Sequence, residues 1–157
     1  MAKTKPDSLK GDDYRKGALE RLSDAFILLR ADQFAGSASS AGRAVEGMLR
    51  AVIWKRDDAV RQGKKSLETG HDLRELLTHV RNLGLLSTSA PRELDSNVQY
   101  IARLWFNNMR YVSSKFVESR WYNLGVVGRD RSFKQATELF FSACERVAKR
   151  CEVLCQK

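Results

Sequence analysis

The chain of 157 residues carries 28 Lys and Arg against 19 Asp and Glu, a formal net charge of +9 at pH 7. This length suits one domain with a single core. No apolar run approaches the roughly 20 residues that a bilayer span needs, which excludes a membrane-spanning class. Runs of alternating Val, Ile and Thr are scarce, so the composition favours an all-α domain.

The excess of positive charge favours a polyanionic partner, such as RNA, DNA or a nucleotide, or an acidic protein; the alternative is a basic solvated face. The first residues, MAKTKPDSLKGDD, are charged and lack the apolar middle of a secretory signal. The three cysteines are an odd number and do not suggest a disulfide framework. We therefore expect a cytoplasmic protein with a mobile basic tail at residues 1–10 and one domain over 11–157.

Two helices are predicted in the first third of the domain. Apolar residues three and four apart define the buried face of the first: Tyr14, Ala18, Leu22, Ala25, Phe26 and Leu29. The second runs through QFAGSASSAGRAVEGMLRAVIW, where the helical period continues although each interior glycine costs about 1 kcal/mol relative to alanine. Its small residues would let a neighbouring helix approach closely.

Next, KRDDAVRQGKKSLETG has mixed charge and is predicted to be a loop. A short third helix follows Asp72, whose spacing to Glu75 is that of a capping pair, and ends near Gly84. The fourth helix has Ser89 as its cap and Pro91 in its first turn. Its buried side holds Leu94, Val98, Ile101, Trp105 and Met109.

The last helix is predicted from Phe133 onward, with Cys144, Cys151 and Cys155 on one face. A zinc site needs four ligands and no histidine lies near these cysteines in the sequence, so we interpret them as small core residues. Residues 111–130 are expected to form one extra helical turn and a loop. No phosphate-binding loop and no dinucleotide fingerprint occurs, so neither a cofactor nor a metal is expected.

The segment NNMRYVSSKF, residues 107–116, gathers two amides, an arginine and a tyrosine at the predicted end of the fourth helix. Together with GRAVEGMLRAVI, which holds Glu46 in an apolar stripe, and GHDLRELL, it resembles the HEPN superfamily (higher eukaryotes and prokaryotes nucleotide-binding domains). The resemblance covers residues 11 to 155 approximately. It implies an up-and-down bundle of about five helices that often forms a homodimer.

Many HEPN proteins are metal-independent ribonucleases of toxin–antitoxin, antiphage or CRISPR-related systems. Others are non-catalytic partners of nucleotidyltransferases, or modules that bind RNA or nucleotides. The ribonucleases carry an arginine and a histidine separated by four to six residues. Arg110 matches the arginine, but the histidine positions hold Lys115, Phe116 and Val117. Because an ordinary lysine is a poor general base near neutral pH, we expect the usual catalysis to be absent.

The remaining polar residues of this segment suit binding. Arg110 is predicted to contact phosphate, with Asn107 and Lys115 in support and Glu46 orienting the arginine; an internal salt bridge between Arg110 and Glu46 is the alternative. Further binding candidates are Asn108, Tyr111 and Arg103. Phe116, Trp121 and Tyr122 either stack on bases beside Arg120, Arg129 and Arg131 or pack in a core or dimer.

Three functions stay open. The leading hypothesis is a HEPN-like homodimer that binds RNA, a nucleotide or a partner protein without cleaving RNA, in a toxin–antitoxin or antiphage system. Its partner protein would be a nucleotidyltransferase or another antitoxin or defence protein. The second is a divergent ribonuclease toxin that uses Arg110 with His71, which is otherwise a cap or loop residue. The third is a purely structural interaction module. His79 is expected on a solvated face.

Overall fold

The computed structural model describes residues 9–67, 70–85 and 91–156. Over these residues the chain is all-α, as predicted. The elements are α1 (Gly11–Arg30), α2 (Phe34–Arg56), α3 (Asp58–Arg61), α4 (Leu73–Asn82), α5 (Pro91–Leu104), the 3₁₀ helix η1 (Asn107–Tyr111), α6 (Ser114–Asn123) and α7 (Phe133–Gln156). The predicted basic tail, apart from Leu9 and Lys10, lies outside the described residues.

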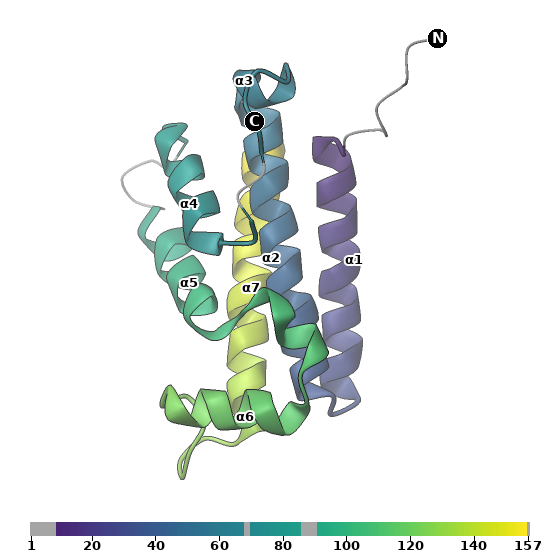
Figure 1. The fold of residues 1–157 in the computed structure, drawn as a ribbon, viewed down its shortest axis with the longest axis vertical. Coiled ribbons are helices and arrows are strands. Elements are labelled where there is room, and N and C mark those ends of the chain that lie inside the picture. The colour runs from purple at the N-terminus through teal and green to yellow at the C-terminus, as the bar shows by residue number, and fades with distance from the viewer. Residues whose placement is uncertain (1–8, 68–69, 86–90, 157) are drawn as a thin grey trace.

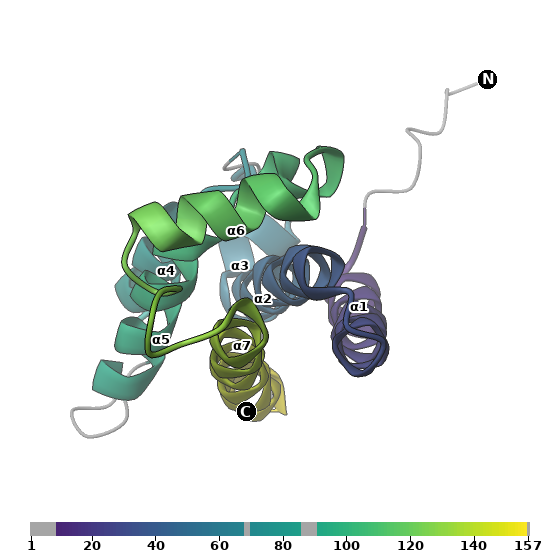
Figure 2. The same cartoon turned by 90° about the horizontal axis from the view of Figure 1, so that it is seen from below.

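The long helices α1, α2 and α7 lie side by side, and α4 and α5 pack on the other side of α2 and α7 (Figure 1). Viewed from below, α6 lies across the end of the bundle (Figure 2). The central helix is α2, which contacts α1, α3, α4, η1, α6 and α7. None of the described helices combines the length and the apolar character that a membrane span requires.

The apolar pattern of α2 explains its central position. Val45, Met48, Leu49, Val52 and Ile53 are fully buried. Between them, alanine, serine and glycine fill the remaining inward positions, so side chains of several neighbouring helices reach the same helix. An apolar surface that extends around most of a helix is typical of a helix enclosed by others.

Two glycines of α2 mark places where neighbours approach closely. A Cβ atom at Gly42 would lie 2.1 Å from the Cδ1 atom of Trp105, and one at Gly47 would lie 2.9 Å from the Cβ atom of Ala18. The Trp105 indole lies against this surface and its Nε1 donates to the Ser39 carbonyl at 3.1 Å. The prediction that small residues of this helix allow close packing is confirmed.

Local signals at the helix ends are also confirmed where the structure describes them. The Asp72 carboxylate accepts hydrogen bonds from the backbone N–H groups of Arg74 and Glu75. Gly84 adopts a φ of 68°, in the left-handed region that favours glycine after a helix. Pro91 is the first residue of α5. The predicted cap Ser89 lies outside the described residues.

Other boundaries were predicted wrongly. The fourth helix ends at Leu104, because Phe106 adopts an extended conformation, and Met109 is buried from η1 instead. The single turn expected after residue 111 is a ten-residue helix, α6. The predicted loop after α2 contains the short helix α3. Phe26, placed in the core by its spacing, is half exposed.

We predict that Gly42→Ala destabilises the protein by about 1–3 kcal/mol, because the new methyl group overlaps the rigid indole of Trp105. The helix propensity of alanine, worth about 1 kcal/mol, offsets part of this cost. Urea unfolding measures the change. Gly17→Ala on α1 is the matched control, since a Cβ atom there meets nothing within 4 Å. Equal effects of the two substitutions would show that the Gly42–Trp105 contact is not tight.

Candidate functional site

Glu46 is a buried acidic residue on the central helix. Its Oε1 atom accepts hydrogen bonds from Nε and Nη2 of Arg50, at 3.2 and 3.0 Å, and lies 2.6 Å from Nδ1 of His71. Arg50 follows four residues later on the same helix, and its Nη1 donates to the Leu67 carbonyl at 3.2 Å. A buried carboxylate requires such partners, because burying an unpaired charge is costly.

His71 reaches Glu46 from the loop that precedes α4. Its φ of 82° and that of Gly70, 65°, lie in the left-handed region, which is unusual for a histidine and marks local strain. Since a carboxylate oxygen only accepts, Nδ1 of His71 is the donor. The His71 side chain is half exposed, so the ring connects a buried carboxylate to the surface.

The expected link between Glu46 and Arg110 is wrong, both as an orienting contact and as an internal salt bridge. Glu46 pairs with Arg50 and His71 instead. The reason is geometric: Arg50 lies one helical turn from Glu46, on the same face, whereas Arg110 lies in η1. The sequence contained the signal for the pair in the four-residue spacing of EGMLR.

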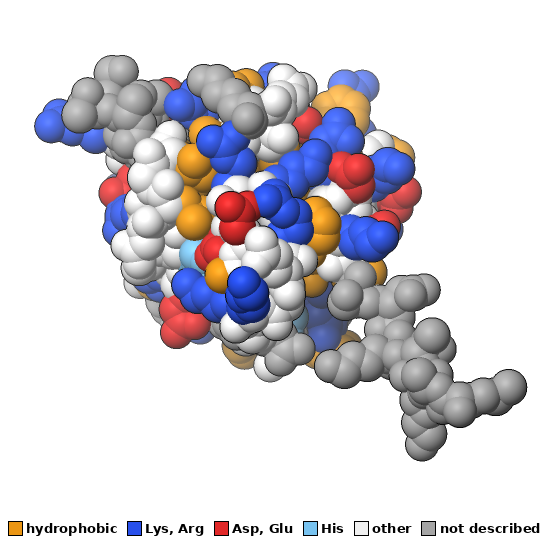
Figure 3. Space-filling view, turned by 90° about the horizontal axis from the view of Figure 1, so that it is seen from above, with side chains coloured by type: hydrophobic (Ala, Val, Ile, Leu, Met, Phe, Trp, Pro, Cys, Tyr) orange, Lys and Arg blue, Asp and Glu red, His pale blue; other side chains and the backbone are white. Residues whose placement is uncertain are grey.

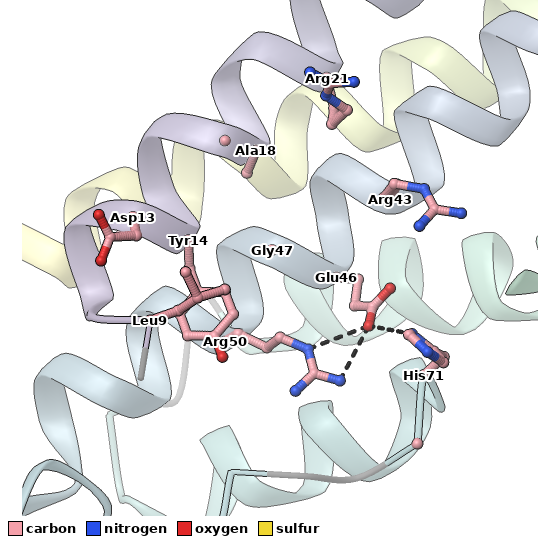
Figure 4. Close-up of a pocket in the computed structure, with 12 residues that line it drawn as sticks. Leu9, Asp13, Tyr14, Ala18, Arg21, Arg43, Glu46, Gly47, Arg50 and His71 are labelled. Atoms are coloured by element: carbon pink, nitrogen blue, oxygen red, sulfur yellow. Dashed lines mark hydrogen bonds and ion pairs between the residues drawn. The ribbon is translucent and has the colours of Figure 1, made fainter. Parts of the chain in front are cut away.

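A pocket of about 670 Å³, the main pocket, opens between α1, α2 and the loop before α4 (Figure 4). Its lining includes Tyr14, Gly17, Ala18 and Arg21 of α1; Arg43, Glu46, Gly47 and Arg50 of α2; and Gly70 and His71. The α1 wall combines Tyr14, Gly17 and Ala18 with the charged residues Asp13 and Arg21. On the other side, Arg50 and His71 point to Glu46 in the close-up view.

A second pocket, the arginine pocket, has a volume of about 340 Å³ and continues along α2 towards its first turn. Arg21 and Arg43 line both pockets, and Arg110 and Ser40 line the second. The Nη2 atom of Arg43 is buried and has no hydrogen-bond partner within the described part of the chain. Such an atom is uncommon, because buried donors are normally satisfied. Three arginines therefore face one small polar pocket.

Arg110 itself is exposed and held by its neighbours. Its Nη1 donates to Oδ1 of Asn107 at 3.1 Å, and its guanidinium lies 4.5 Å from the centre of the Tyr111 ring. Asn107 and Arg110, predicted to lie together, therefore do contact each other. Asn108 and Lys115 are exposed and do not line the arginine pocket. Arg103 is directed elsewhere, since it donates to the Leu124 carbonyl.

A third pocket, the α4 pocket, has a volume of about 400 Å³ and is lined by both His71 and Asn107. His71 thus lies near the segment that holds Arg110. Of the three pockets described, however, none is lined by both His71 and Arg110. His71 and the arginine of the motif therefore line different pockets.

The aromatic candidates divide into two groups. Trp121 is fully buried, contacts Phe140 and donates from Nε1 to the Leu104 carbonyl, so it is a core residue. Tyr111, Phe116 and Tyr122 are exposed. Arg120 lies over the ring of Phe106, at 4.8 Å. Arg129 and Arg131 are exposed, and neither lines the main or the arginine pocket.

The prediction that His79 lies on a solvated face is wrong. Its side chain is 11% exposed, and its Nε2 lies 2.7 Å from Oδ2 of Asp57. The other oxygen of Asp57 accepts from the backbone N–H groups of Ala59 and Val60 and so caps α3. This pair fastens α4 to the junction of α2 and α3. Sequence periodicity missed it because the partner lies 22 residues away.

Near α3, part of the basic charge is compensated by acidic residues. At the end of the molecule that carries α3, Lys and Arg side chains alternate with acidic ones (Figure 3). Lys55 pairs with Asp12 at 3.2 Å, Lys65 lies 3.8 Å from Asp57, and Arg61 pairs with Asp58. This surface is less suited to an anion than the arginine pocket, where Arg43 has an unsatisfied donor.

The cysteines are buried, as predicted, and burial raises the pKa of each thiol. Thiols of this kind behave as small apolar groups. Within the described residues, no group of three or more His, Cys, Asp or Glu side chains is arranged to hold a metal ion. Comparisons with protein-family models, curated proteins and solved structures gave no match to this chain.

We predict that the Asp57–His79 pair makes the free energy of unfolding depend on pH in the acidic range. The hydrogen bond from His79, with those from the Val60 and Ala59 amides, holds the pKa of Asp57 below its ordinary value of 3.8. A lowered carboxyl pKa stabilises the fold above the unfolded-state pKa, and the stabilisation is lost as the pH falls through the folded-state pKa. Asp57→Asn should therefore cost about 2 kcal/mol at neutral pH, with the difference from wild type shrinking below about pH 4.

Urea unfolding between about pH 7 and about pH 3 tests this dependence. Asp58→Asn is the matched control, because the neighbouring carboxylate is 74% exposed and its pair with Arg61 contributes at most about 1 kcal/mol. A difference between Asp57→Asn and wild type that stays constant with pH would contradict the prediction.

Proposed function

We propose that this chain is a HEPN-like domain that binds phosphate groups of RNA or of nucleotides at the arginine pocket, without cleaving RNA. The observation that carries the proposal is Arg43: a guanidinium nitrogen buried between two pockets, with no partner within the described residues. An oxyanion would satisfy it. Guanidinium groups and phosphate form short, charge-assisted hydrogen bonds, often two at a time.

The surroundings of Arg43 favour the same ligand class. Arg110 and Arg21 add two cations to the pocket wall, although Arg21 also lies 3.3 Å from Asp24. The Ser40 hydroxyl donates to the Arg21 carbonyl at 2.7 Å and so is not counted as a donor to the ligand. The carboxylate that would repel a phosphate, Glu46, is already paired with Arg50 and His71. Asn107 fixes one nitrogen of Arg110 and leaves the rest of its fork for a ligand. The sequence predicted one arginine for one phosphate, and the proposed site contains three arginines.

The resemblance adds the biological setting to this proposal. A homodimer, a nucleotidyltransferase or antitoxin partner, and a role in toxin–antitoxin or antiphage defence are what a HEPN-like domain implies. Together with the cytoplasmic location expected from composition, they stay predictions. Exposed Tyr111, Phe116 and Tyr122, close in sequence to Arg110, suit stacking on bases or contact with a second protein.

The proposal predicts that Arg43→Gln and Arg110→Ala each weaken binding of a short single-stranded RNA by about tenfold or more, since a charge-assisted contact is lost. Fluorescence anisotropy at about 50 mM and about 200 mM salt measures affinity and salt dependence. Each lost phosphate contact should reduce the slope of log K against log salt by about 0.7.

Arg92→Gln is the matched control, because this exposed arginine on α5 lines none of the three pockets. It should change affinity little. Equal effects of Arg43→Gln, Arg110→Ala and Arg92→Gln would mean that the net charge, and not the arginine pocket, binds RNA. Absence of any binding to RNA or nucleotide, with an acidic protein co-purifying in stoichiometric amount, would favour the interaction module instead.

A divergent metal-independent ribonuclease is the second candidate, favoured by the Glu46–His71 contact. The carboxylate fixes Nδ1 of His71, so Nε2 is the nitrogen left to exchange a proton. It would take the proton of a ribose 2′-hydroxyl; the 2′ oxygen would bond to phosphorus, and the 5′ oxygen would leave with a proton returned by the imidazolium. The products are a 2′,3′-cyclic phosphate and a 5′-hydroxyl end.

Incubation of the purified protein with total RNA in EDTA tests this second candidate. Cleavage that disappears in both His71→Ala and Arg110→Ala, while Arg92→Gln retains it, would establish ribonuclease activity. RNA that stays intact under conditions where it binds supports the non-catalytic proposal, which we prefer because His71 and Arg110 line no common pocket among those described.

A further inference from the structure

We infer that the main pocket selects guanine, and that Glu46 is the residue that recognises it. This inference rests on the proposed function, because the phosphate of the same nucleotide would lie in the arginine pocket. The ligand is a guanosine monophosphate unit, either as a free nucleotide or as one residue of a single-stranded RNA.

The starting observation is that, among the described residues, the contacts of Glu46 all end on one carboxylate oxygen. The two hydrogen bonds from Arg50 and the contact with His71 all end on Oε1. The other oxygen points away from these two residues in the close-up view (Figure 4), and Glu46 lines the main pocket. The buried carboxylate is thus held through Oε1, and Oε2 is the acceptor oxygen that remains for a ligand.

An acceptor oxygen of this kind matches guanine better than the other bases. The Watson–Crick edge of guanine places two donors side by side, the N1–H and the 2-amino group. The N3–H of uracil lies between two carbonyl oxygens, which a carboxylate repels, and the amino groups of adenine and cytosine each lie beside an acceptor nitrogen. Base edges of single strands are read through such donor and acceptor patterns, and charged acceptors strengthen them.

The shape of the main pocket also suits a base. Its volume of about 670 Å³ lies within the range of about 300–1,000 Å³ typical of small-molecule sites. Across from Glu46, the α1 wall contributes Tyr14, Gly17 and Ala18, with the charged residues Asp13 and Arg21 also in the lining. Tyr14 is a half-buried aromatic residue, of the type that stacks on bases, and the small residues leave room for a flat ring.

The two pockets are spaced as one nucleotide requires. Glu46 and Ser40 are six residues apart on α2, which corresponds to about 9 Å along the helix. Arg43 lies midway and lines both pockets. A base at Glu46 would therefore place its own phosphate beside Arg43, where the two pockets meet. This length is comparable with that of a nucleoside monophosphate.

Isothermal titration calorimetry of the full chain with GMP, IMP, AMP, CMP and UMP tests the inference. IMP is the sharpest comparison, because it differs from GMP only by the missing 2-amino group. We expect GMP to bind at least about fivefold more tightly than IMP, and about tenfold or more tightly than UMP. Titration of the oligonucleotides UUGUU and UUIUU, where I is inosine, shows whether the preference also holds within RNA.

Two variants separate base recognition from phosphate binding. Glu46→Gln should remove the preference for GMP over IMP. Arg43→Gln should weaken all five nucleotides by similar factors and keep the preference. Circular dichroism checks that each variant is folded, and the comparison of GMP with IMP on the wild-type protein does not depend on either variant.

Equal affinity for GMP and IMP, both free and within RNA, would overturn the guanine assignment. If Arg43→Gln still weakened every nucleotide in that case, the proposed phosphate site would stand. Nucleotide binding that does not change in Arg43→Gln would overturn the proposed function itself, and the inference with it.

Discussion

Close packing against the glycines of α2 is the constraint on which the main pocket and the arginine pocket depend. At Gly47 the backbone of α2 lies against Ala18, so α1 is near enough for Arg21 and Arg43 to line the same pockets. At Gly42 the ring of Trp105 rests on the helix and is fixed by its bond to Ser39. Trp105 follows the last residue of α5 directly, so this contact also determines where η1 and Arg110 lie. A larger side chain at either glycine would separate the groups that form the arginine pocket.

The buried charge of Glu46 imposes a second constraint. A carboxylate inside the bundle is tolerated because Arg50 and His71 both reach it, and removing one member of a buried pair typically costs about 3–5 kcal/mol. The same contacts hold the loop before α4, where His71 has a positive φ that is strained for a residue other than glycine. Arg50 also holds the start of this loop, because it donates a hydrogen bond to the Leu67 carbonyl. Glu46 therefore connects α2 to a loop that would otherwise have few reasons to adopt this conformation.

Sequence periodicity was sufficient to predict the five main helices, because in each of them apolar residues recur every three or four positions and face one core. It failed at residues 105–123, where Phe106 breaks the helix and a 3₁₀ turn leads into α6. Turns of that kind depend on tertiary contacts such as the burial of Met109 and Trp121, which no local pattern encodes. The site shows the same division. Asn107 and Arg110 were associated correctly because they lie three residues apart, within one turn.

Contacts between distant segments could not be predicted in this way. His71 and His79 were judged by their positions next to or within a short helix, and both were expected to be solvated or capping residues. Their partners, Glu46 and Asp57, lie 25 and 22 residues away. A buried acidic residue in an apolar stripe does signal that a cation or a donor must come near, but three-dimensional packing decides which one.

If the arginine pocket binds phosphate as proposed, the arrangement of charges separates binding from cleavage. Phosphate binding needs several cations around one anion, and the arginine pocket provides Arg21, Arg43 and Arg110 without any contribution from a titrating group. Cleavage additionally needs a proton acceptor within hydrogen-bond reach of the ribose next to that same phosphate. His71 instead lines the main and α4 pockets, held there by a carboxylate on the central helix. Because that carboxylate is buried and also paired with Arg50, the imidazole cannot move towards the arginine pocket without leaving a buried charge with one partner fewer. The contact that would orient His71 as a general base therefore also holds it away from the proposed phosphate site.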